Sequence, residues 1–174
     1  MDRGREFLQS QVNNCVMQHQ TFLRNLEDHE KQAEDARFRD LCSRYIPQMR
    51  EHQRMIEEYA QSIGAELSVG KKALGAALGL ARNAADLARE SDFLRLVGDI
   101  VTARQSQDTF TTFARVGPRI GEPRLAEMSE RMSEHHKQYV DDANALVADM
   151  FVDHVNNTEP GRATSGSGSA QAAY

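Results

Sequence analysis

The chain has 174 residues, of which 40% are hydrophobic and 27% are charged, and its formal net charge is −5. This length suffices for one domain with a hydrophobic core. The negative charge argues against a dedicated nucleic-acid-binding protein, and no apolar run approaches the roughly 20 residues that cross a bilayer. The first residues lack the apolar stretch of a secretory signal. We therefore expect a cytoplasmic protein with no nucleic-acid and no membrane partner.

The first third of the chain predicts two long helices joined by a short turn. Residues 4–33 repeat apolar side chains in alternating steps of four and three, the rhythm of a helix that packs on a partner helix. Asp35 is placed to cap a second helix, which is expected to end at Ile63 before Gly64. Pro47 falls inside this helix and should kink it. The short turn makes the two helices antiparallel neighbours.

The remainder predicts a second helical hairpin. A third helix begins at Ser91 or Asp92, and the glycines and prolines of residues 117–123 mark the next turn. A fourth helix then runs to about His154. Residues 64–91 are predicted to be a long connection that carries one short helix, and the Gly- and Ser-rich residues 159–174 a disordered tail.

These elements predict an all-α fold over residues 1–158. Two hairpins joined by one long crossover between the second and third helices give an up-down four-helix bundle of ferritin-like topology. The crossover is long enough to make the second and third helices parallel.

Polar side chains interrupt the predicted inward stripes at similar depth, one on each helix. At about 1.5 Å rise per residue they fall near the middle of the bundle, and they are His19, His52, Arg104 and His135. Met49-x-x-His52 and Met132-x-x-His135 repeat the spacing that di-iron carboxylate bundles use for Glu-x-x-His. The frame of a ferritin-like site is therefore present without its carboxylates. The neighbouring His136 is predicted to lie at the surface.

The hairpin pattern, the Ile63-Gly64 stop, the long crossover and the run IGEPRLAEM at residues 120–128 resemble the YciE/YciF family of ferritin-like bacterial stress proteins. The resemblance covers roughly residues 5–150. It implies a ferritin-like bundle, a homodimer and a stress-linked role. The family's metal site uses inward glutamates, and the predicted register has His, Met and Arg at these positions. Glu134, next to the inward stripe of the fourth helix, is the one carboxylate that remains.

Two functions fit this pattern. The first is a non-catalytic bundle without a cofactor, which acts through its surfaces on a protein partner, because iron and manganese require anionic oxygen ligands. Its core would hold a polar cluster of Arg104, Asp108 and Tyr139. The second is a metal-binding redox or storage protein with an unusual His/Met/Cys site, in which soft donors favour copper or zinc over iron. Its candidate ligands are His19, Met49, His52, His135 and Glu134, with Cys15 one turn from His19.

Geometry separates the two functions. Convergence of the nitrogens of His19, His52 and His135 would favour a metal, whereas Arg104 in the space between them would exclude one.

Overall fold

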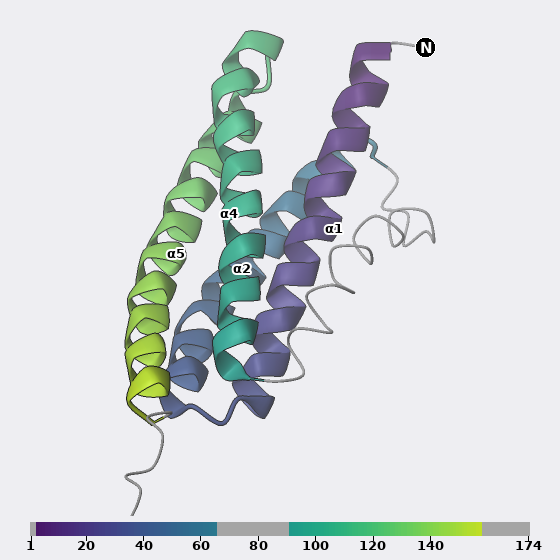
Figure 1. Ribbon diagram of the computed structural model, residues 1–174. Coiled ribbons are helices and arrows are strands. Elements are labelled where there is room, and N and C mark those ends of the chain that lie inside the picture. Colours follow the sequence, from purple (N-terminus) through teal and green to yellow (C-terminus); the bar gives the residue numbers. More distant parts are fainter. Residues whose placement is uncertain (1–2, 66–90, 158–174) are drawn as a thin grey trace, which may run out of the picture.

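The computed structural model describes residues 3–65 and 91–157, and these residues form helices without any strand. The elements are α1 (Arg3–Gln32), α2 (Ala36–Ser62), α4 (Asp92–Val116), the 3-10 turn η1 (Gly117–Ile120) and α5 (Pro123–Asn157) (Figure 1). The predicted all-α class is confirmed. Within these two ranges, none of the helices has the length and apolar character needed to span a bilayer. The predicted connection falls mainly on residues 66–90, and the predicted tail on residues 159–174, outside the described residues.

The helices form two antiparallel hairpins that pack side by side, with α1 against α4 and α2 against α5 (Figure 1). The end of α2 lies beside the beginning of α1, where the Gln9 side-chain amide donates to the Ile63 carbonyl at 2.8 Å. The beginning of α4 lies at the opposite end, where the Asp92 carboxylate accepts from the backbone N–H groups of Glu34 and Asp35 at 2.6 and 2.7 Å. Helices α2 and α4 therefore point in the same direction.

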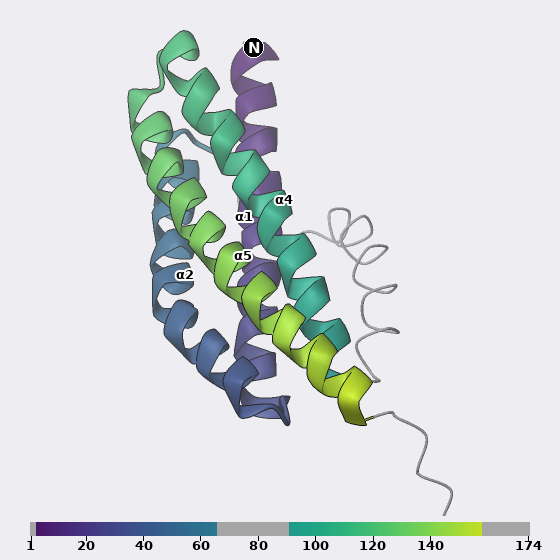
Figure 2. The ribbon, with the colours of Figure 1, turned by 60° about the vertical axis from the view of Figure 1, so that its left-hand side comes forward.

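Local signals set the helix ends where the sequence predicts them. The Asp35 carboxylate accepts from the backbone N–H of Arg37 at 2.8 Å and caps α2. The Ser91 hydroxyl accepts from the backbone N–H of Leu94 at 3.3 Å and caps α4. Gly64 follows α2 with φ of 72°, a conformation that favours glycine. Helix α2 runs through Pro47 and curves along its length (Figure 2).

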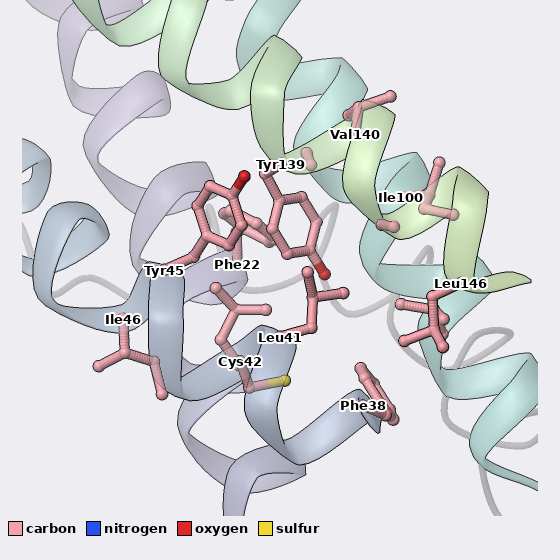
Figure 3. Close-up of a cluster of buried hydrophobic side chains, with 14 of the residues drawn as sticks. Phe22, Phe38, Leu41, Cys42, Tyr45, Ile46, Ile100, Tyr139, Val140 and Leu146 are labelled. Atoms are coloured by element: carbon pink, nitrogen blue, oxygen red, sulfur yellow. The ribbon is translucent and has the colours of Figure 1, made fainter. Parts of the chain in front are cut away.

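The core consists of two hydrophobic clusters with a polar layer between them. One cluster gathers aromatic and aliphatic side chains of all four helices, among them Phe22, Phe38, Tyr45, Tyr139 and Leu146 (Figure 3). The other lies nearer the N-terminus of α1 and includes Val12, Ile56, Tyr59, Phe110 and Met132. Between them, each helix contributes at least one buried polar residue. We call this set the polar layer, and its members are His19, His52, Gln53, Ser106 and His136.

Helix α4 turns a different face inward from the one predicted. Its buried residues are Leu96, Asp99, Ile100, Ala103, Ser106, Phe110 and Phe113. Arg104 and Asp108, which the sequence pattern placed in the core, are exposed. Apolar residues occur all around this helix, and Val101 is 61% exposed. The predicted stripe was therefore ambiguous, and a shift of one residue rotates a helix by about 100°.

Candidate metal centre

Three histidines from three helices meet in the polar layer. His19 of α1, His52 of α2 and His136 of α5 are 0%, 2% and 0% exposed. One ring nitrogen of each lies within 4.8 Å of those of the other two, and the ring centroids are 5.2–5.9 Å apart. In a metal site with metal–nitrogen distances of about 2.0–2.1 Å, ligand nitrogens lie roughly 3.3–3.5 Å apart. Side-chain torsions would therefore need to bring these nitrogens closer by no more than about 1.5 Å.

The proton position on His19 follows from its partner, Gln53. His19 Nδ1 lies 2.8 Å from Gln53 Oε1, and because an amide oxygen only accepts, Nδ1 carries the proton. The Gln53 amide is itself oriented by two acceptors, since its Nε2 donates to Glu57 Oε1 at 2.6 Å and to the Val16 carbonyl at 3.4 Å. The lone pair of His19 thus lies on Nε2, which is buried and has no hydrogen-bond partner.

His136 and His52 present a free ring nitrogen in the same way. His136 Nδ1 donates to the Met132 carbonyl at 2.7 Å, which leaves the lone pair on Nε2. His52 Nε2 lies 2.9 Å from His135 Nδ1, with the two ring planes 7° apart. When His52 donates in this contact, its lone pair lies on Nδ1. Both His136 Nε2 and His52 Nδ1 are buried without a partner.

Burial keeps the three imidazoles neutral. Desolvation lowers the pKa of His19 to about 4, of His52 to about 2 and of His136 to about 3. All three groups are therefore uncharged at pH 7, the form in which imidazole binds a metal ion. Each unpartnered buried nitrogen costs about 1–3 kcal/mol of desolvation free energy, and a bound ion would recover this cost.

Apolar and soft side chains surround the three histidines. The ring of Phe110 lies 5.9 Å from His19 and 5.2 Å from His136 between centroids, and that of Phe22 lies 5.6 Å from His136. Met49 and Met132 are fully buried, each one turn from a histidine. Burial also raises the pKa of the Cys15 thiol, so this group stays protonated. The arrangement suits a transition-metal ion held by imidazoles rather than a hard, oxygen-ligated cation.

The structure brings together two of the predicted ligands and replaces a third. His19 and His52 converge as expected. His135 is half-buried, and its Nδ1 contacts His52 Nε2 instead of converging with the nitrogens of the other histidines. The prediction that His136 lies at the surface was wrong, because His136 is the buried member of the pair. Steps of four and three from Met132 to Tyr139 admit either histidine on the inward face, so the spacing did not distinguish them.

Of the other predicted site residues, Met49 is buried one turn from His52, and the rest lie apart from the three histidines. Glu134 is exposed and lines a surface cleft together with His135. The predicted core cluster of Arg104, Asp108 and Tyr139 does not form, because Arg104 and Asp108 face solvent while Tyr139 is buried among hydrophobic residues. Arg104 therefore does not fill the space between the histidines.

Sequence reasoning missed Gln53, which orients His19, because it lies beside the predicted stripe and carries no signal of its own.

Comparisons of the chain with protein-family models, with curated proteins and with solved structures find no match.

Proposed function

We propose that this protein binds one transition-metal ion in the polar layer of its bundle, through His19, His52 and His136. The observation that carries the proposal is the convergence of three buried imidazole nitrogens, each from a different helix and each without a hydrogen-bond partner. A core that needed only packing would gain from apolar side chains at these positions, because unpartnered buried polar atoms destabilise the folded state.

The partners of the histidines support the proposal. Metal-ligating histidines usually donate their other ring N–H to a carbonyl or carboxylate oxygen, which fixes the tautomer and aims the lone pair at the metal. Gln53 and the Met132 carbonyl hold His19 and His136 in this manner. His135 Nδ1 is within hydrogen-bond distance of His52 Nε2, and it accepts from this nitrogen in the tautomer that leaves the lone pair of His52 on Nδ1.

The alternative, a scaffold whose metal centre is lost, has less support from the geometry. That interpretation placed the Arg104 cation inside the core, where it would repel a metal ion, and Arg104 is exposed. The lack of carboxylates in the polar layer still argues against iron or manganese. The ferritin-like topology, the relationship to the YciE/YciF stress proteins and the cytoplasmic location remain proposals. The common direction of α2 and α4 supports the first.

Metal content after reconstitution tests the proposal. The full chain is stripped with a chelator, incubated separately with Cu(I) under anaerobic conditions, Zn(II) and Co(II), desalted, and analysed for bound metal. We expect one ion per chain for at least one of these metals. His136→Phe, which keeps a buried ring, should lose it, whereas His154→Phe at an exposed position of the same helix should retain it.

Circular dichroism of both variants checks that they stay helical. The proposal is wrong if the unmodified chain takes up none of the three metals, or if the folded His136→Phe protein still holds a full equivalent.

A further inference from the structure

The charge of the polar layer bears on which ion it accepts. Every group that the layer offers is neutral: three imidazoles, the Gln53 amide beside His19 and the Ser106 hydroxyl. Among the described residues, the hydrogen bonds of the three histidines and of their partners reach one carboxylate, that of Glu57. Glu57 does not contact a histidine; it accepts from Gln53, which in turn contacts His19. The charged side chain that acts electrostatically on His52 is the cation Arg131, which adds no negative charge to the layer. The layer therefore supplies almost no negative charge to balance a cation.

The lack of negative charge disfavours the binding of a divalent ion far more than that of a monovalent ion. The desolvation free energy of an ion grows with the square of its charge, so burying a dication costs about four times as much as burying a monocation. One remote carboxylate offsets part of a single positive charge, but it leaves a dication with more than one uncompensated charge in the apolar core.

The number of donors and their apolar surroundings point the same way. Zinc is almost always four-coordinate, and its three-histidine sites complete the shell with water or hydroxide. Here the rings of Phe22 and Phe110, which have no lone pair, pack against His19 and His136. A d¹⁰ monovalent ion such as Cu(I) is satisfied by three imidazoles. Met49 and Met132 belong to the two hydrophobic clusters on either side of the layer, so they make its surroundings apolar.

We propose that the polar layer selects Cu(I) over Zn(II). This inference rests on the proposed function and adds the identity and charge of the ion.

Competition measurements under anaerobic conditions test the selectivity. The full-length apoprotein is titrated with Cu(I) against bicinchoninate in the presence of ascorbate, and with Zn(II) against a chromophoric zinc chelator. We expect one Cu(I) per chain, bound at least 100-fold more tightly than Zn(II). A tenfold excess of Zn(II) should leave the bound copper in place.

A variant with a carboxylate next to a histidine tests the electrostatic cause. Gln53→Glu combined with Glu57→Gln places a carboxylate against His19 Nδ1 and keeps a donor and an acceptor between residues 53 and 57. This double variant should shift the ratio of Cu(I) to Zn(II) affinity toward zinc by at least tenfold. Gln61→Glu introduces a carboxylate at an exposed position of α2 and should leave the ratio unchanged.

The outcomes separate this inference from the proposed function. Tighter binding of Zn(II) than of Cu(I) at the three histidines would overturn the Cu(I) assignment and leave metal binding intact. Binding of neither ion would overturn both. An affinity ratio that the double variant does not change would show that charge is not the basis of selection.

Discussion

At the scale of single residues, Asp99 is the buried carboxylate of the hydrophobic cluster that contains Phe22 and Phe38. It is 1% exposed, and its Oδ2 lies 2.7 Å from His29 Nδ1, while its Oδ1 has no partner. Burial raises the pKa of Asp99, and the contact with His29 opposes this shift only in part. The carboxylate is therefore less stable in its charged form than it would be in water.

Replacing Asp99 should change how stability depends on pH. Because the pKa of Asp99 is higher in the folded than in the unfolded state, its contribution to stability is fully present below its unfolded pKa, about 4. That contribution is lost as pH rises through the folded pKa. Asp99→Asn does not titrate, so the free energy of unfolding of the variant minus that of the original chain should increase from pH 4 toward neutral pH. Urea denaturation at a series of pH values measures this difference.

Asp108→Asn, which removes a carboxylate at an exposed position of the same helix, is the matched control. A flat difference for Asp99→Asn would contradict the assigned shift.

The candidate ligands show how far a single residue can be predicted. His19 and His52 interrupt clear apolar stripes on α1 and α2, so their inward orientation followed from spacing alone. The choice between His135 and His136 depends on the rotation of α5 about its axis, which the packing of its neighbours sets. Asp99 gave no signal, because its partner His29 is 70 residues away in sequence.

At the scale of elements, helix ends were more predictable than helix faces. Asp35, Ser91 and Gly64 act on the backbone within a few residues, so each marked its helix end without knowledge of the fold. The inward face of α4 instead depends on contacts with α5 and α1. Since the apolar residues of α4 are distributed on all sides of the helix, its sequence alone did not identify that face.

In the hairpin of α4 and α5, replacing two glycines by alanine should have opposite effects on stability. A Cβ at Gly117 would lie 2.8 Å from both the Ala126 Cβ and the Glu122 carbonyl oxygen, whereas a Cβ at Gly98 meets nothing within 4 Å. Gly98→Ala should stabilise the protein by about 0.5–1 kcal/mol, because alanine is the better helix former. Gly117→Ala should destabilise it by about 1–3 kcal/mol through overpacking.

Chemical denaturation of the two variants in parallel measures both effects. Equal stabilities of the two variants would show that η1 does not enforce the close approach of α4 and α5.

At the scale of the whole molecule, the order and direction of the helices agree with the predicted hairpins. Short turns force neighbouring helices to be antiparallel, so topology within each hairpin followed from loop length. The depth at which polar groups meet was also predictable, because helical rise converts sequence distance into height. The identity of the group that α4 contributes, Ser106 in place of Arg104, was not.

Exposed apolar residues near the end of α5 form a candidate contact surface for the predicted homodimer. Phe151, Val152 and Val155 are 58%, 56% and 51% exposed. Sedimentation velocity of the full chain should show a dimer, and Phe151→Asp should shift it toward the monomer if this surface forms the contact. Phe7→Asp, at a 66% exposed position on α1, is the control and should leave the dimer intact. A monomer for the unmodified chain would contradict the prediction.

The three candidate ligands come from α1, α2 and α5, while α4 contributes only the Ser106 hydroxyl to the polar layer. A bound ion would therefore link the hairpin of α1 and α2 to α5, but not to α4. Partial opening that separates α1, α2 or α5 would have to break a coordination bond, whereas α4 is free to detach with the ion still in place. Amide exchange would then be slowed by metal along three helices and left nearly unchanged along the fourth.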